Sequence, residues 1–287
     1  MKNNQGKPGC PIVIIHRGYS WYLPYTLRHA RLYNPTSPLF LVTDQKRSFL
    51  KLFARNLPLQ DHMQEADAFS KIYTHLSHNQ PAFELFCFQR WFVLHSVMAA
   101  LELDHCFYLD TDVLVYSNLS AVRPAFAAAD MTLNFKQGPY STFINNCSAL
   151  RGFCEYITRL FTHHTVEMAA DFETWKRAGV PGGISDMHAL RKYAESSPLR
   201  TVDTAEVKDG ACFDNVFHES DGFEMKDGIK QIEWRNGIPY GRRTRDREKI
   251  RFHTLHMQGN SKGYILSYQS KLGWMTRMIG LYNRFNL

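Results

Sequence analysis

The sequence has no pair of cysteines at C-x-x-C spacing, although it contains six cysteines in 287 residues. Several of them lie within apolar runs, which is typical of buried thiols in a reduced compartment and argues against a disulfide framework or a zinc knuckle. No apolar stretch is long enough to span a membrane, and the run Ile12 to Ile15 near the start is too short for a signal-peptide core. We therefore expect a cytoplasmic protein.

Internal repeats and low-complexity tracts are also absent, and a hydrophobic fraction of 44% with 21% charged residues is that of a globular protein. A chain of 287 residues suits one large domain, or one domain with an appended lobe. The net charge of +7 favours an anionic partner, whether a sugar nucleotide, a phospholipid surface or a nucleic acid. Charge alone does not choose among them.

The first part of the chain alternates apolar strands with helical patterns. Strands are predicted at 11–16 and 38–44, and each is followed by a helical pattern, at 22–33 and 45–55. Such alternation predicts an α/β fold with a mixed, mostly parallel sheet and helices on both faces. The loops at the strand ends are then free to bind a ligand.

Four residues that follow these strands are candidates for nucleotide binding. They are His16, Gly18, Tyr19 and Asp44. The local alternative is that Gly18 serves only a turn and Asp44 only caps the next helix.

The apolar run 106–116 is interrupted by two carboxylates, Asp110 and Asp112. The run predicts a strand buried on both faces, where Asp is least expected. Alternate residues share one face of a strand, so both carboxylates are expected to point the same way at its carboxyl end. Carboxylates that close repel each other unless a cation or a shared proton relieves them, which predicts a Mn²⁺ or Mg²⁺ site. The plain alternative is a strand end that opens a turn.

An aromatic-rich helix, predicted at 81–103, precedes this strand. Glu84 and Arg90 are the exceptions on it, and a buried guanidinium needs an anion, either Glu84 or a diphosphate. Further on, Asn145 lies in an apolar context that suggests hydrogen bonds to sugar hydroxyls or to loop backbone. Ser185 explains the cap of a helix beginning at Asp186, which leaves Asp186 for another role or as a favourable charge at that helix end.

The segment 200–255 changes character, with short alternating stretches and an Asn236-Gly237 turn that predict a small antiparallel addition. A strand then ends at His256, followed by Gly259 and Lys262 in the pattern H-x-x-G-x-x-K. An imidazole can complete a carboxylate metal site, and a nearby Lys can neutralise diphosphate oxygens. The last residues, 266–287, form an amphipathic pattern that packs on the core or rests on an anionic membrane.

Taken together, these motifs resemble the metal-dependent GT-A glycosyltransferases, and among them family eight, the class of glycogenin and the bacterial lipopolysaccharide galactosyltransferases. The D-x-D, the Arg on the preceding helix, the Asn, the Asp before a helix and the H-x-x-G-x-x-K occur in the family's order. The chain departs from the family pattern at three places: His16-Arg17-Gly18 replaces an early Asp and Asn, Met187 replaces Gln, and no Pro-Trp follows Lys262.

The resemblance implies a single catalytic domain of GT-A (Rossmann-like) fold over residues 1–287. Its nucleotide-binding half is 11–116, its sugar and acceptor half is 117–265, and 266–287 is a C-terminal amphipathic helix. It also implies transfer of a hexose from a nucleoside-diphosphate sugar, UDP-linked or GDP-linked, to a glycan or glycolipid hydroxyl. The implied partners are this donor and acceptor and no nucleic acid, with peripheral membrane contact through the basic aromatic C-terminus.

The resemblance also assigns roles. A Mn²⁺ or Mg²⁺ ion would be held by Asp110, Asp112 and His256. The catalytic candidates are Asp186, Asn145 and Arg90, with Asp186 the base if the reaction inverts, or a stabiliser of an oxocarbenium-like centre if it retains. The nucleotide contacts would be His16, Gly18, Tyr19, Asp44, Thr111, Gly259 and Lys262.

Two alternatives stay open. The D-x-D pattern also resembles the nucleophile motif of haloacid-dehalogenase phosphohydrolases, and the chain could be a catalytically inactive relative that only binds nucleotides.

Overall fold

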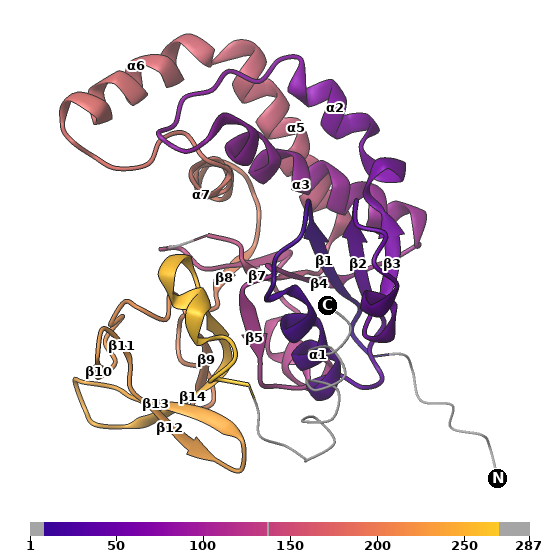
Figure 1. The fold of residues 1–287 in the computed structure, drawn as a ribbon. Coiled ribbons are helices and arrows are strands. Elements are labelled where there is room, and N and C mark those ends of the chain that lie inside the picture. The colour runs from indigo at the N-terminus through magenta and orange to yellow at the C-terminus, as the bar shows by residue number, and fades with distance from the viewer. Residues whose placement is uncertain (1–8, 137, 270–287) are drawn as a thin grey trace.

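A central sheet of seven strands organises the molecule (Figure 1). The computed structural model describes residues 9–136 and 138–269. The strand order is β3-β2-β1-β4-β7-β6-β8, and every pair is parallel except the two that involve β7. The strands are β1 Ile12–His16, β2 Leu39–Thr43, β3 Arg55–Pro58, β4 Cys106–Leu109, β6 Met131–Leu133, β7 Ser141–Ile144 and β8 Thr201–Asp203. The predicted α/β class with a mixed, mostly parallel sheet is confirmed.

Helices cover both faces of this sheet, because its central strands are apolar on both sides. In β1, Ile12 and Ile14 belong to one buried cluster, and Val13 and Ile15 to another. The helices and 3-10 turns are α1 Leu23–Tyr33, η1 Ser48–Leu52, η2 Leu59–His62, α2 Gln64–Ser70, α3 Pro81–Ala100, α4 Leu119–Val122, η3 Arg123–Phe126, α5 Cys147–His163, α6 Thr165–Arg177, α7 Asp186–Ser196 and η4 Gly259–Tyr264.

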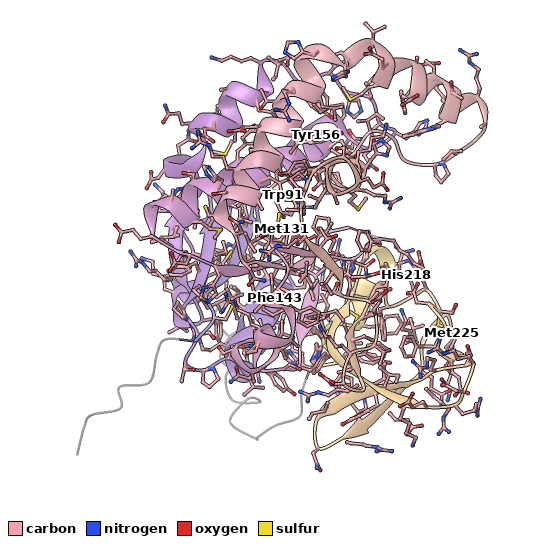
Figure 2. The ribbon with its side chains drawn as sticks, turned by 180° about the vertical axis from the view of Figure 1, so that it is seen from behind. Trp91, Met131, Phe143, Tyr156, His218 and Met225 are labelled. Carbon is pink, nitrogen blue, oxygen red and sulfur yellow. The ribbon has the colours of Figure 1, made fainter. Side chains whose placement is uncertain are left out.

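The two clusters lie on opposite sides of the sheet. The cluster with Val13 and Ile15, which we call the first cluster, contains residues of α2, α3 and α5. The cluster with Ile12 and Ile14, the second cluster, contains residues of α1, η1 and α4. Figure 2 labels Trp91 and Met131 of the first cluster and Phe143 of the second. Burial on both faces explains why the strand sequences read as unbroken apolar runs.

A smaller sheet forms the second layer, as the segment 200–255 predicted. Its strands are β12 Ile232–Arg235, β13 Ile238–Arg242, β14 Lys249–His256 and β5 Val113–Val115, all antiparallel, with β9 Ala211–Phe213 parallel to β14. A separate ribbon joins β10 Met225–Lys226 to β11 Ile229–Lys230. Asn236 and Gly237 have φ of 51° and 76°, so the predicted tight hairpin turn between β12 and β13 is confirmed.

Two of the elements predicted from the sequence, at 45–55 and at 106–116, are wrong. The helix predicted at 45–55 is instead the short η1 turn followed by β3, an edge strand whose Arg55, Asn56 and Pro58 gave no strand signal. The single strand predicted at 106–116 is two strands, β4 and β5, which belong to different sheets.

All six cysteines are free thiols; four are buried as predicted, whereas Cys87 and Cys147 are partly exposed. Within the described ranges, no helix is both long and apolar enough to cross a bilayer. Most of the amphipathic segment predicted at 266–287 lies outside the described residues, and so does its membrane contact.

Candidate active site

A cleft of about 520 Å³ opens beyond the carboxyl ends of β1 and β4. Its walls come from α3, from the turn after β4, from the start of α7 and from the segment after β14. Open α/β sheets bind their ligands at this edge, where loops follow the ends of parallel strands. The cleft is therefore the candidate active site.

The two carboxylates of the D-x-D motif lie on a turn. The backbone N–H of Val113 donates to the carbonyl of Asp110 at 3.3 Å, and the chain passes from the large sheet into the small one. The expectation that Asp110 and Asp112 share one face of a continuous strand is therefore wrong. Both nevertheless line the cleft.

Strand pairing brings the C-terminal histidine to this turn. In the β5–β14 ladder His256 is opposite Val113, and the Met257 N–H donates to the Asp112 carbonyl at 2.8 Å. His256 Nε2 lies 3.7 Å from Asp112 Oδ1, and Lys262 Nζ lies 3.2 Å from Asp112 Oδ2. Burial would lower the pKa of Lys262, but Asp112 raises it above its ordinary value. The structure thus unites the two sequence motifs around Asp112.

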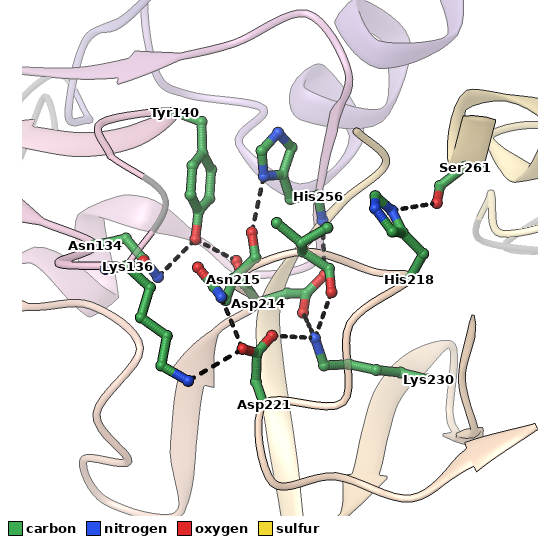
Figure 3. A network of polar contacts seen from close by, with 11 residues as sticks. Asn134, Lys136, Tyr140, Asp214, Asn215, His218, Asp221, Lys230, His256 and Ser261 are labelled. Carbon is green, nitrogen blue, oxygen red and sulfur yellow. Dashed lines mark hydrogen bonds and ion pairs between the residues drawn. The ribbon is translucent and has the colours of Figure 1, made fainter. Parts of the chain in front are cut away.

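Two contacts fix the orientation of the His256 imidazole (Figure 3). Its Nδ1 is 2.8 Å from the Asn215 carbonyl, and the ring stacks on Tyr140 at 3.9 Å between centroids. A carbonyl can only accept, so Nδ1 carries a hydrogen, and Nε2 is the ring nitrogen that faces Asp112.

A buried ion cluster lies beneath this imidazole, and we call Lys230, Asp214 and Asp221 the closed cluster. Lys230 Nζ is 2.7 Å from Asp214 and 2.8 Å from Asp221, and the Lys230 and Asp214 side chains are 0% exposed. Asp214 Oδ2 accepts the His256 backbone N–H at 2.9 Å. Burial would lower the pKa of Lys230, but the two carboxylates raise it. The closed cluster therefore anchors the end of β14.

A second ion cluster forms one wall of the cleft, and we call Arg90, Asp110 and Asp186 the cleft cluster. Arg90 lies 2.9 Å from Asp110 and 2.7 Å from Asp186, and the Tyr108 hydroxyl donates to Asp110 at 2.5 Å. The anions that Arg90 was predicted to need are thus these two carboxylates, and neither Glu84 nor a diphosphate is required. Burial would lower the pKa of Arg90, but both carboxylates raise it well above its ordinary value.

Asp186 has little capacity left for a substrate. Its Oδ2 accepts from the Nε and Nη2 of Arg90 and from Trp91 Nε1, and its Oδ1 accepts from the Met187 N–H. Ser185 caps α7 by accepting from the His188 N–H, as predicted. These contacts favour a role for Asp186 in holding Arg90 over the role of a base.

Asn145 lies outside the cleft. Its Oδ1 accepts from Arg123 Nε at 2.9 Å, and its Nδ2 donates to the carbonyls of Phe126 and Ala129 at 3.0 Å. Of the two predicted uses for this amide, the geometry supports the binding of loop backbone. We therefore remove Asn145 from the proposed catalytic residues.

The predicted nucleotide contacts separate into two groups. His16, Thr111 and Lys262 line the cleft. The Nε2 of His16 is buried with no hydrogen-bond partner among the described residues. Burial lowers the pKa of His16.

The other four residues lie beside the cleft. The Gly18 N–H donates to Asp44 at 2.8 Å, and the Tyr19 ring lies 3.8 Å beneath the Arg47 guanidinium. Asp44 lines a neighbouring pocket of about 630 Å³. Gly259 begins η4 with a φ of 58°, a conformation that suits glycine.

Arg17, Tyr108 and Phe83 are among the cleft-lining residues that the sequence analysis did not assign to the site. Arg17 follows β1 directly, which is a signal for a ligand-binding cation at a strand end. Tyr108 gave no signal, because aromatic residues in an apolar strand indicate core.

The donor chemistry at the turn suits a divalent cation. Two carboxylates and an imidazole with a free Nε2 are oxygen and nitrogen donors of the kind that Mn²⁺ and Mg²⁺ accept. Among residues 9–136 and 138–269, however, no three Asp, Glu, His or Cys side chains are arranged as a metal site. Asp110 is engaged by Arg90, and Asp112 by Lys262. The residues thus fit the ion by donor type.

No family model and no curated protein matches the sequence. Among solved structures, mouse xyloside xylosyltransferase 1 in its apo form is 10% identical with a TM-score of 0.47, over 68% of this chain and 84% of that chain. GlyE of Streptococcus pneumoniae TIGR4, a glycosyltransferase, is 11% identical with a TM-score of 0.35, over 69% of this chain and 46% of that one. The PaToxG glycosyltransferase is 11% identical with a TM-score of 0.37, over 66% and 72%. Because these scores are below 0.5, the fold class rests on the strand order of this chain.

Proposed function

We propose that the protein is a metal-dependent glycosyltransferase of GT-A fold that transfers a hexose from a UDP-linked or GDP-linked sugar to a hydroxyl of a glycan or glycolipid. The observation that carries the proposal is the position of Asp112, which lies 3.7 Å from His256 Nε2 and 3.2 Å from Lys262 Nζ in the cleft. Residues of both predicted halves, 11–116 and 117–265, meet there.

The side chains of the cleft suit a leaving diphosphate. Negative charge develops on its oxygens as the glycosidic bond breaks, and Lys262 and Arg17 supply positive charge at the cleft. A divalent cation bound by Asp110, Asp112 and His256 would add Lewis-acid stabilisation of the same charge. Arg90 and Tyr108 orient Asp110 through its Oδ1.

The direct test is thermal unfolding with uridine or guanosine diphosphate, with and without Mn²⁺. We expect one nucleotide to stabilise the protein only with the metal, by about 2.7 kcal/mol at a hundredfold excess over its Kd. Asp112→Ala removes this gain, and Asp104→Ala, at an exposed position, retains it. Equal stabilisation without metal would sink the proposal.

Turnover separates the alternatives. A glycosyltransferase releases nucleoside diphosphate from the sugar donor, whereas an inactive relative binds the nucleotide without release. A phosphohydrolase would instead cleave a generic phosphate ester. The Oδ1 of Asp110 already accepts from Arg90 and Tyr108, which disfavours Asp110 as the nucleophile that this alternative needs.

A further inference from the structure

Two side chains at the beginning of α3 have unusual environments. Phe83 is 61% exposed although it is a large aromatic, and Glu84 is 1% exposed although it forms no ion pair among the described residues. A buried carboxyl without a cation is costly, and such groups are found where a ligand uses them. Both residues line the cleft.

Only one oxygen of Glu84 is occupied. Its Oε2 accepts from Ser77 Oγ at 3.0 Å and from Asn79 Nδ2 at 2.7 Å. No hydrogen bond to Oε1 is found in the described part of the chain. Burial raises the pKa of this carboxyl, although the hydrogen bond from Asn79 opposes the shift. The free Oε1 can accept a hydrogen bond, which suits a hydroxyl-bearing ligand.

The loop before α3 is fixed to the loop before α7. The Ile184 N–H donates to the Leu76 carbonyl at 2.8 Å, and the His78 N–H donates to the Gly182 carbonyl at 3.2 Å. At Gly183 a Cβ atom would lie 2.4 Å from the Leu76 carbonyl oxygen, so only glycine allows this approach. Asn79 and Glu84 are therefore positioned before any ligand arrives.

We propose that Asn79, Phe83 and Glu84 form a subsite for the acceptor sugar at the mouth of the cleft. This inference rests on the proposed glycosyl transfer and deepens it. The exposed Phe83 ring offers an apolar face for the C–H face of a pyranose, and Glu84 Oε1 accepts a hydrogen bond from a sugar hydroxyl. An apolar surface with a few convergent polar groups is the usual composition of such a site.

The test is saturation-transfer NMR on the full chain with methyl glucoside and methyl galactoside, in the presence of uridine diphosphate and Mn²⁺. We expect saturation of ring protons in the wild type, loss of the signal in Phe83→Ala and a drop of about fivefold in Glu84→Gln. Leu52→Ala, at an apolar residue that is 72% exposed outside the cleft, is the matched control and keeps the signal. No glycoside signal in the wild type, an unchanged signal in Phe83→Ala, or saturation of tetramethylammonium instead would overturn the subsite.

Two readouts keep this inference separate from the proposed function. Because Phe83 is exposed, Phe83→Ala is expected to fold even if Glu84→Gln does not. Stabilisation of Phe83→Ala by nucleotide and metal is expected to match that of the wild type. If the wild type shows no such stabilisation, the proposed function fails. If it does and the glycosides do not bind, only the subsite fails.

Discussion

The cleft cluster and the closed cluster have the same composition, one basic side chain between two carboxylates, and differ in their surroundings. In the cleft cluster the Asp110 side chain is 24% exposed, whereas Lys230 and Asp214 in the closed cluster are 0% exposed. The cleft cluster lines the open cleft, whereas in the closed cluster Asp221 alone reaches the surface, with a side chain that is 11% exposed and lies 3.4 Å from Lys136. The cleft cluster can therefore exchange its ion-pair partners with a ligand, whereas the closed cluster acts as a fixed support.

Each cluster also positions one of the proposed metal ligands. Arg90 fixes Asp110 from the α3 side, and Asp214 fixes the backbone of His256 from the small sheet. The two ligands are therefore oriented by separate ion clusters. This difference can be tested by breaking each cluster in turn.

The largest effect is expected from Lys230→Met. It removes the cation that pairs with the fully buried Asp214, while Asp221 keeps the exposed Lys136 at 3.4 Å, and breaking a buried pair from one side costs about 3–5 kcal/mol. Urea denaturation measures this loss in the free energy of unfolding. Lys226→Met, at an exposed position of β10, is the control. A loss below about 1 kcal/mol would mean that the closed cluster is not a support.

Arg90→Lys tests the cleft cluster. The substitution keeps the charge but loses the planar fork that reaches Asp110 and Asp186 together. We expect nucleoside diphosphate release to fall roughly 100-fold, because small misplacements in an active site have effects of that size. Stability should fall by less than about 2 kcal/mol. Arg159→Lys, at an exposed residue of α5, is the control, and wild-type turnover in Arg90→Lys would remove Arg90 from the proposed machinery.

The pH dependence of stability should have opposite signs at the closed cluster and at the cleft. Burial alone would raise the pKa of Asp221, but Lys230 lowers it, so its contribution to stability is present above the unfolded value and lost in acid. Burial raises the pKa of Glu84, so its contribution is present in acid and lost as pH rises through the raised value.

Matched amide variants measure these signs. By urea denaturation at about pH 3.5 and about pH 7, Asp221→Asn should be destabilised mainly at the higher pH. Glu84→Gln should gain stability relative to the wild type at the higher pH. A common sign for both variants would contradict the contrast.

The smallest effect is expected at a surface pair. Arg151 and Glu155 on α5 are 3.1 Å apart, and both side chains are more than half exposed. Arg151→Ala should lower the free energy of unfolding by only about 0.3–0.5 kcal/mol. A loss comparable to that of Lys230→Met would show that burial does not set the strength of these pairs.

The sequence predicted best those elements whose burial is visible in the local spacing of apolar residues. β1, β2 and α1 lie within a residue or two of their predicted bounds, because unbroken apolar runs mark strands buried on both faces and helically spaced apolar positions mark the buried face of a helix. The helix after Ser185 was equally clear, since its cap is local. The edge strand β3 was missed because one buried leucine gives no periodic signal.

The candidate site was only partly predictable. Motif spacing selected Asp112, His256 and Lys262, which the structure brings together, but the geometry at Asp110 assumed one strand where the chain changes sheets. The closed cluster was not predicted, because its three residues lie in a segment of short strands and turns without a clear pattern and a buried lysine is rare. Lys230 stands between Ile229 and the polar Gln231, so its neighbours in the sequence gave no signal of burial.

The pairing of β5 with β14 has a consequence for synthesis on the ribosome. Val113–Val115 emerges early, but its neighbour Lys249–His256 is among the last described strands to be made. The histidine and the acidic turn become adjacent only when this late strand docks. A nascent chain can therefore build most of its large sheet while it still lacks the proposed catalytic centre, which arises in the final stage of folding.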